Sequence, residues 1–289
     1  MKKMKQSLFF LGGLMLLFFT LIFGCANQIR DLENSPQNVN KFIDLSHWKL
    51  TLPIDKNGDG KPDEYEQPKL QQYPEVPDIK PYFYDGEDSS LVFYCPYTAV
   101  STANSKYSRS ELREQLVPGD NNTNWTFEDG RRMKGNLRLA DISEGHRTIV
   151  MQIHGRLTNA QKARIKAKDN DAPPLLKIYI QQNKVRVARK VLVDEKLSGD
   201  EILLKSSWKD GEPFYFLREV NRERFNLEVI ATKGKLEVKM DEESIVYEDQ
   251  NMQKWPFENY FKAGNYLQSK EEGAFAEVRF YKLEHGEVN

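Results

Sequence analysis

Beyond residue 40 the chain alternates apolar and polar side chains with a period of two, which is typical of half-buried β-strands. Around the centre of the chain, Ile149, Met151 and Ile153 share one face of such a strand, whereas Gln152 and His154 share the other. This pattern predicts a strand with an apolar inner face and a polar outer face.

Further strands are predicted at intervals along the chain. Residues 177–181 repeat the same alternation. Residues 225–230 and 235–240 predict a hairpin, because Gly234 lies in the short turn between them. Residues 275–281 predict the last strand. Since strands follow one another at short spacing, we expect neighbouring strands to pair in the antiparallel sense.

No apolar pattern with a period of 3.6 continues long enough to predict a long helix, and residues 66–73 predict only short helical turns. The expected fold class is therefore all-β, a sandwich of two antiparallel sheets. There is no internal repeat and no change of composition after residue 40, so we expect one domain over residues 41–289.

The N-terminal segment is expected to be a processing signal rather than part of the fold. Lys2, Lys3 and Lys5 precede an uncharged apolar run over residues 8–24, which ends at Cys25. This junction resembles a bacterial lipobox, in which the cysteine becomes the lipidated first residue of the mature chain.

The predicted organisation is a signal peptide over residues 1–24, lipidation at Cys25 and a polar tether over residues 25–40. Ala26 follows the cysteine where an aspartate would retain the protein in the inner membrane, which favours the outer membrane of the bacterial cell envelope. A transmembrane anchor is the alternative, because a run of about 17 residues is at the lower limit for crossing a bilayer.

Composition narrows the classes of protein that remain. The 289 residues carry 42 Lys and Arg against 43 Asp and Glu, a net charge of −1, and 39% of residues are apolar. These values exclude disorder and a disulfide scaffold, and they argue against a nucleic-acid partner, which usually requires a basic excess. With Cys25 acylated, Cys95 has no partner, and no disulfide is expected.

Three predicted strand segments carry polar residues of the same parity. In the first, Arg109, Glu111 and Arg113 share a face, where two cations flanking a carboxylate can hold an anion. In the second, Gln152 and His154 place a hydrogen-bond donor beside a proton acceptor. Taken alone, each segment is equally compatible with an ordinary solvated surface.

The third segment places a tyrosine beside a cation, which stabilises a phenolate and so allows the hydroxyl to donate and recover a proton. The alternative is aromatic packing with a lysine that reaches into solvent. The residues of this segment that share one parity are Tyr260, Lys262, Tyr266 and Gln268.

Taken together and in this order, the segments at 109–113, 152–154 and 260–266 resemble the three motif blocks of the family 7 polysaccharide lyases, the alginate lyases. The segment at 48–53 and the hairpin at 227–240 are also similar to that family. The resemblance, which covers roughly residues 42–283, implies a jelly-roll β-sandwich with a substrate cleft on the concave sheet. It also implies alginate as the partner, a monomeric state and no cofactor for the chemistry.

Such lyases cleave a uronate polymer by β-elimination, leaving 4,5-unsaturated ends. The resemblance implies that Arg109 and Gln152 neutralise the sugar carboxylate, that His154 is the base and that Tyr266 is the acid. Whether Arg109 or Arg113 contacts the reacting carboxylate stays open. The remaining residues assigned to substrate binding are Glu111, Arg113, Lys177, Tyr179, Gln181, Tyr260, Lys262 and Gln268.

The family associates a Gln-Ile-His motif with guluronate-containing blocks. A net charge of −1 is unusual for a polyanion binder, but the charge is uneven: residues 161–168 and 177–190 are rich in Lys and Arg and contain no acid. Such local basic segments can attract a polyuronate while distant acids cancel the sum.

A polar loop over residues 55–66 fits the twelve positions of an EF-hand loop and predicts a structural calcium site, although no flanking helices are expected. The alternative is a polar turn after the first strand. The candidate ligands are Asp55, Asn57, Asp59, Asp63 and Glu66.

Three other functions compete with an alginate lyase. A non-catalytic carbohydrate-binding jelly roll would not need His154 and Tyr266 together, and a glycoside hydrolase would need two facing carboxylates, for which no motif is found. A lyase for another polyuronate, such as a glucuronan, stays open, as does the choice between endo and exo action.

Overall fold

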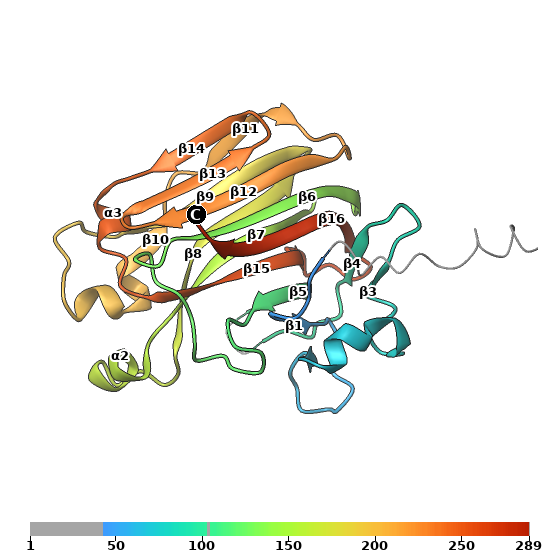
Figure 1. Ribbon diagram of the computed structural model, residues 1–289, viewed down its shortest axis with the longest axis horizontal. Coiled ribbons are helices and arrows are strands. Elements are labelled where there is room, and N and C mark those ends of the chain that lie inside the picture. The colour runs from blue at the N-terminus through green and yellow to red at the C-terminus, as the bar shows by residue number, and fades with distance from the viewer. Residues whose placement is uncertain (1–42, 103–104, 289) are drawn as a thin grey trace, which may run out of the picture. The chain divides into compact units, whose positions relative to one another are not determined.

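The computed structural model describes residues 43–102 and 105–288, and almost all of its regular structure is β (Figure 1). The strands are β1 (Trp48–Thr51), β2 (Glu64–Tyr65), β3 (Phe83–Asp85), β4 (Leu91–Pro96), β5 (Arg109–Glu114), β6 (Arg131–Ile142), β7 (Arg147–Arg156), β8 (Asp171–Gln181), β9 (Lys184–Leu192), β10 (Trp208–Asp210), β11 (Phe214–Glu219), β12 (Phe225–Thr232), β13 (Lys235–Met240), β14 (Glu243–Tyr247), β15 (Glu258–Leu267) and β16 (Phe275–Glu287). The helices are short: η2 (Lys69–Glu75), α2 (Asn159–Arg164), η3 (Glu201–Leu203), η4 (Lys205–Ser207) and α3 (Gln250–Gln253).

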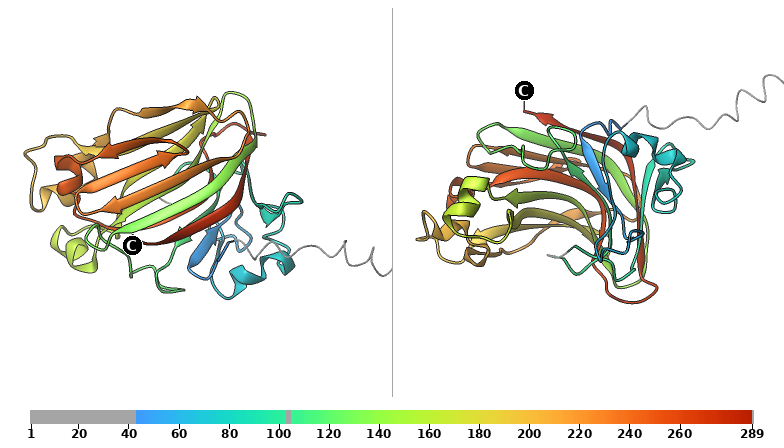
Figure 2. Two further views of the ribbon diagram at one scale, coloured as in Figure 1. Left: turned by 45° about the horizontal axis from the view of Figure 1, so that its top comes forward. Right: turned by 90° about the horizontal axis from the view of Figure 1, so that it is seen from below.

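Within the described residues, the strands form two antiparallel sheets that face each other (Figure 2). The first sheet has the order β10-β9-β8-β7-β15-β5-β1-β2, with β11 added to β9, and the second has the order β14-β13-β12-β6-β16-β4-β3. The predicted all-β jelly-roll sandwich is confirmed. Helical turns also occur where they are predicted, since η2 begins at Lys69.

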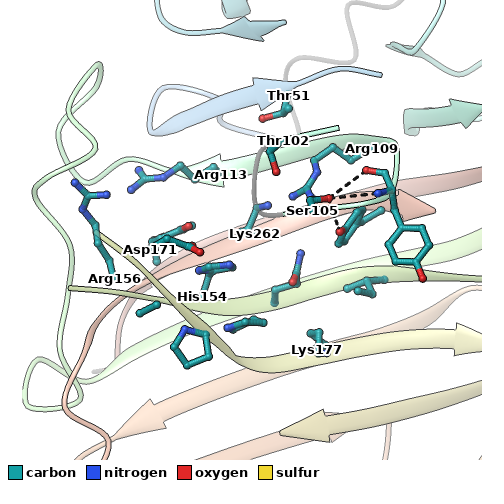
Figure 3. Close-up of a pocket in the computed structure, with 18 of the residues that line it drawn as sticks. Thr51, Thr102, Ser105, Arg109, Arg113, His154, Arg156, Asp171, Lys177 and Lys262 are labelled. Carbon is teal, nitrogen blue, oxygen red and sulfur yellow. Dashed lines mark hydrogen bonds between the residues drawn. The ribbon is translucent and has the colours of Figure 1, made fainter. Parts of the chain in front are cut away.

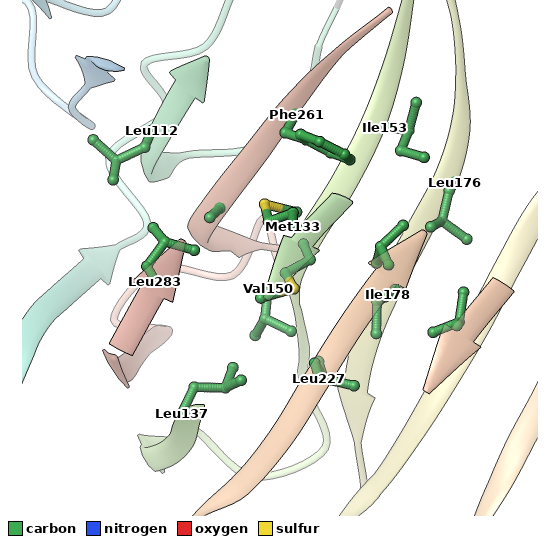
Figure 4. Close-up of a cluster of buried hydrophobic side chains, with 14 of the residues drawn as sticks. Leu112, Met133, Leu137, Val150, Ile153, Leu176, Ile178, Leu227, Phe261 and Leu283 are labelled. Atoms are coloured by element: carbon green, nitrogen blue, oxygen red, sulfur yellow. The ribbon is translucent and has the colours of Figure 1, made fainter. Parts of the chain in front are cut away.

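The core lies between the sheets and is filled by the apolar half of each alternating strand (Figure 4). Met133 and Leu227 of the second sheet are fully buried against residues such as Ile153, Ile178 and Phe261 of the first. The predicted hairpin is formed by β12 and β13. Burying one face of every strand leaves the opposite face of the first sheet free to carry polar chemistry.

One buried carboxylate, Glu114 at the end of β5, connects the two sheets. It accepts hydrogen bonds from Trp125 Nε1 at 2.8 Å, the Phe261 backbone N at 2.9 Å, Arg131 Nη2 at 3.1 Å and His285 Nδ1 at 2.6 Å. Burial alone would raise the pKa of Glu114, but these bonds, led by that of His285, hold it below its ordinary value. The carboxylate is therefore charged and fully partnered inside the sandwich.

The predicted face of Ile149 is wrong. The pairing of β7 with β8 shifts register between Ile149 and Met151, so one extra residue is inserted in β7. Val150 therefore enters the core, and Ile149 packs with Tyr179 and Ala188 on the outer face of the first sheet. Ile153 and Met151 lie in the core as expected.

A second irregularity lies in β15 at Gly264, where φ is +136° and only glycine is unstrained. A Cβ there would lie 2.7 Å from the Ser110 backbone O and 2.8 Å from a carbon of Phe93. The chain therefore needs glycine at this position, directly opposite Glu111 of β5.

Gly264→Ala is expected to lower the free energy of unfolding by about 2–4 kcal/mol, because backbone strain and overlap with the backbone add together. Urea unfolding followed by circular dichroism measures this change. The matched control is Gly286→Ala, since a Cβ at Gly286 meets no atom within 4 Å. Equal stability of the two variants would contradict the strain argument.

None of the helices in residues 43–102 and 105–288 has the length and apolar character needed to cross a membrane. The predicted signal peptide, the predicted lipidation site at Cys25 and the predicted tether at 25–40 all lie outside the described residues. Cys95 is buried and forms no disulfide with any of the described residues.

Candidate active site

A polar pocket of about 760 Å³ lies on the outer face of the first sheet (Figure 3). The three polar segments predicted to carry chemistry meet there, because β7, β15 and β5 are adjacent strands. Tyr266 pairs with Arg109 across β15 and β5, and Tyr260 pairs with His154 across β15 and β7. The register thus brings together residues more than a hundred positions apart in the sequence.

Glu111 organises the cations at the centre of this site. Its carboxylate accepts hydrogen bonds from Arg109 Nη1 at 3.0 Å, from Lys262 Nζ and from Gln152 Nε2. Burial would raise the pKa of Glu111, but Lys262 and Arg109 lower it overall, so the group is ionised. Two cations around one carboxylate leave a net positive charge of one, which suits an incoming anion.

Lys262 is 7% exposed, and burial followed by the charge of Arg109 lowers its pKa to about 8. Glu111 opposes this shift. Lys262 is therefore mostly protonated at neutral pH and loses its charge in mildly alkaline solution. The positive charge of the centre falls as the pH rises through this value.

Tyr266 is held by Arg109 and by Ser105, a residue that the sequence analysis missed. The Arg109 guanidinium carbon lies 3.9 Å from the centroid of the Tyr266 ring, and Arg109 Nη2 donates to Ser105 Oγ at 2.8 Å. Ser105 Oγ lies 2.7 Å from the Tyr266 hydroxyl. The phenolic group therefore has a fixed position and a hydrogen-bond partner through which its proton can be exchanged.

His154 is oriented from two sides. Its ring stacks on Tyr260 with centroids 5.2 Å apart, and its Nδ1 lies 3.0 Å from the Gly155 carbonyl oxygen. A carbonyl oxygen only accepts, so Nδ1 must carry the hydrogen, and Nε2 keeps a lone pair. Burial, followed by the charge of Lys262, lowers the pKa of His154 to about 4. The imidazole is therefore neutral at neutral pH, as a general base must be.

Gly155 allows the neighbouring strand β8 to come close to β7 beside His154. A Cβ at Gly155 would lie 2.8 Å from the Pro173 carbonyl oxygen. The pairing of β7 and β8 is irregular here, next to His154. Bulges of this kind commonly re-aim a side chain beside a functional site.

Arg113 is fixed differently from Arg109. Its Nη1 donates to the Glu114 carbonyl at 2.7 Å, and its Nη2 donates to the Asn121 carbonyl at 3.0 Å and Asn124 Oδ1 at 3.1 Å. Within the described chain no carboxylate forms an ion pair with Arg113. Both arginines line the pocket.

Of the residues expected to bind substrate, Lys177 and Gln268 line the pocket, whereas Tyr179 and Gln181 do not. Tyr179 is 4% exposed and lies under cationic side chains further along the sheet, and Gln181 Oε1 accepts from Arg147 at 3.4 Å. Their parity is predicted correctly, but their position along the strand removes them from the pocket. The lining residues missed by sequence reasoning include Lys49, Thr51, Ser105, Tyr107, Arg156, Asp171 and Lys205.

The pocket is strongly basic although the chain as a whole is not. Only two acidic residues of the described chain, Glu64 and Asp171, line it. The basic run at 161–168 does not contribute: it forms the exposed helix α2 and the turn after it, outside the pocket. The cations that line the pocket are Lys49, Arg109, Arg113, Arg156, Lys177, Lys190, Lys205 and Lys262.

The predicted calcium loop is not assembled as a metal site. Among the residues that the structure describes, no three His, Cys, Asp or Glu side chains converge as metal ligands. Asp55 accepts from the backbone N of Gly58, Asp59 and Gly60, and Glu66 turns away to accept from Gln115 Nε2 at 3.0 Å. The loop oxygens are thus used by hydrogen bonds, as expected for a polar turn. The candidate ligands affected are Asp55, Asn57, Asp59, Asp63 and Glu66.

A two-sheet antiparallel sandwich with a cationic pocket, a neutral imidazole and a fixed phenol on one sheet defines a jelly-roll protein with an enzyme-like site. Comparison with known proteins identifies the family within this class. The family model described as alginate lyase matches residues 43–287. The chain belongs to the alginate lyases of polysaccharide lyase family 7.

Individual relatives agree with this assignment. A curated alginate lyase from Klebsiella pneumoniae is 33% identical over 97 residues, which make up 33% of this chain and 30% of that protein. The solved structure of alginate lyase A1-II′, a member of polysaccharide lyase family 7, is 30% identical with a TM-score of 0.67, covering 87% of this chain and 98% of that chain. The solved structure of the alginate lyase from Klebsiella pneumoniae, at 21% identity, has a TM-score of 0.64 over 86% of this chain and 98% of that chain, which shows the same fold.

Proposed function

We propose that the protein cleaves alginate by β-elimination in the pocket on its first sheet. The observation that carries this proposal is the meeting of Arg109, Gln152, His154 and Tyr266 in one basic pocket. A variant of A1-II′ has been solved with a product written GGG, and another with a substrate written GGMG. These complexes support an alginate oligosaccharide as the ligand of this fold.

The chemistry requires three tasks. The C5 proton of a uronate is only weakly acidic, and its removal builds negative charge on the adjacent carboxyl group. Arg109 and Gln152, aligned by Glu111, stabilise that charge. His154 Nε2 takes the C5 proton, the C4–O4 bond breaks as the C4–C5 double bond forms, and Tyr266 protonates the departing O4.

We further propose a preference for guluronate blocks. In guluronate the C5 hydrogen and O4 are both axial and lie on opposite faces of the ring, so a base and an acid on separate strands suit it. In mannuronate they lie on the same side, where one group, Tyr266, would have to serve both roles. His154 of β7 and Tyr266 of β15 are offset along their strands, with Lys262 and Gln152 paired between them.

The deciding experiment is ultraviolet absorbance during incubation with polyguluronate, polymannuronate and glucuronan. A lyase forms a conjugated unsaturated uronate that absorbs, whereas a hydrolase or a binding module forms none. We expect the fastest rise with polyguluronate. A rise in absorbance with glucuronan alone would show that glucuronan, and not alginate, is the substrate. No rise with any of the three polymers would refute the lyase function.

We also propose that the catalytic domain acts as a monomer tethered to the bacterial envelope, with the outer membrane as its location. Lipidation at Cys25 after an uncharged apolar run would place the domain next to polymer entering the cell.

Cys25→Ser is expected to move the protein from the membrane fraction to the soluble envelope fraction, because the acyl chains have no other attachment point. Fractionation with an antibody against the domain measures this change. Ala26→Ser, which leaves the cysteine in place, is the control. Full retention of the Cys25→Ser protein in membranes would show instead that the segment is a transmembrane anchor.

A further inference from the structure

A row of side chains crosses the first sheet in register and extends beyond the pocket. Arg109 pairs with Tyr266, Tyr266 with Ile149, Ile149 with Tyr179, and Tyr179 with Arg186. The row therefore runs over β5, β15, β7, β8 and β9. Ile149 and Tyr179 form an apolar cluster against which Tyr266 packs, so the surface is continuous from the catalytic tyrosine outward.

Towards the far end of this row, three cationic side chains lie over the ring of Tyr179. The guanidinium carbons of Arg147 and Arg186 lie 5.3 Å and 4.9 Å from the centroid of its ring, and Lys177 Nζ lies 5.8 Å from it. The ring is 4% exposed because these side chains cover it. Stacking on an aromatic face orients each guanidinium while leaving its N–H groups free to bind.

These arginines also lack the acidic partners that their neighbours have. The other cations of β9 are paired: Lys184 with Glu219, Arg189 with Asp249 and Lys190 with Asp210. Within the described part of the chain, neither Arg147 nor Arg186 forms an ion pair with an acid, and Arg147 has only the long contact with Gln181. Two adjacent cations without a counter-charge form a site for an anion.

We infer that Arg147 and Arg186, held over Tyr179, form a distal subsite for a uronate carboxylate that sets the length of substrate used best. Neighbouring strands lie ~4.8 Å apart, roughly the advance of one pyranose unit in a 1,4-linked chain. Arg186 lies three strands from Tyr266, so a polymer crossing the strands reaches it about three units from the cleaved bond. This inference rests on the proposed lyase function.

The test compares kcat/KM of wild type and Arg147→Gln/Arg186→Gln on guluronate trimers and hexamers. Charge-assisted hydrogen bonds of this kind predict a loss of about tenfold or more on hexamers, with less than about a twofold change on trimers, which do not reach the subsite. The wild-type kcat/KM on hexamers should also fall more steeply with added salt than that of the variant. If the two arginines had only a structural role, their replacement would lower kcat/KM on trimers and on hexamers alike.

The matched control is Arg132→Gln/Lys134→Gln, which removes the same charge from exposed positions of β6 on the other sheet. Each single variant, Arg147→Gln and Arg186→Gln, is measured with its thermal unfolding, so that a folding defect in the double variant does not decide the result. Equal effects on both lengths, or none on either, would refute the subsite while leaving the lyase function intact. An inactive wild type would refute both.

Discussion

Replacing His154 with alanine is expected to lower the turnover of polyguluronate by at least ~100-fold while the sandwich stays folded. The imidazole is neutral, and its Nδ1 donates a hydrogen bond to the Gly155 carbonyl. Its Nε2 therefore carries a lone pair that can accept a proton. In the proposed mechanism, loss of the ring removes the group that accepts the C5 proton. Ultraviolet absorbance of the unsaturated product measures the rate.

His146→Ala is the control for this variant, since His146 contacts Glu271 at 3.2 Å and does not line the pocket. The pH profile adds a second measurement. Because the pKa of His154 is lowered to about 4, the base stays neutral above that value, and kcat/KM should fall on the acid side only as the pH approaches it. A His154→Ala enzyme that keeps more than about a tenth of wild-type turnover would exclude His154 as the base.

The second large effect is expected for Tyr266→Phe. The substitution keeps the ring under the Arg109 guanidinium and removes only the hydroxyl that lies 2.7 Å from Ser105 Oγ. If this hydroxyl protonates O4, kcat should fall by ~100-fold or more while KM changes little, because the group acts in the transition state. Steady-state kinetics on polyguluronate separate the two constants.

Tyr94→Phe on the second sheet is the control, since it removes a hydroxyl from a tyrosine outside the pocket. A packing role for Tyr266 makes the opposite prediction, because phenylalanine fills nearly the same space. Near-normal turnover of Tyr266→Phe would therefore overturn the assignment of the acid, and with it the mechanism proposed above.

Which residues meet around the pocket could be predicted largely because polar residues of one parity share a face of a strand. That rule places Arg109, Glu111 and Arg113 together without any knowledge of the neighbouring strands. The family resemblance, which rests on the order of the three segments, then implied the role of each residue. Parity cannot supply the position along a strand relative to its neighbours, and for this reason Tyr179 and Gln181, which are predicted to bind substrate, lie outside the pocket.

Other features depend on contacts that no local pattern records. The bulge that turns Ile149 outward adds one residue without a glycine or proline to mark it. Ser105 lies in a loop that has no periodicity, yet its hydroxyl joins Arg109 to Tyr266. Only the folded arrangement of strand and loop shows these positions to be part of the site.

The loop at 55–66 shows the opposite case, in which a strong pattern is not matched by converging side chains. Acid and amide side chains at the right spacing also form hydrogen bonds with their own backbone, and Asp55 does so with three amide groups. The spacing alone does not distinguish the two uses of these oxygens.

The buried carboxylate of Glu114 has a consequence for how the enzyme loses activity on heating. It belongs to β5, which carries Arg109 and Glu111, and it is bound by Arg131 and His285 of the opposite sheet. Strand β5 cannot separate from that sheet without leaving an ionised group unpartnered in the interior, which is costly. The pocket and the sandwich should therefore melt as one cooperative unit, so that thermal inactivation reports the unfolding of the whole domain.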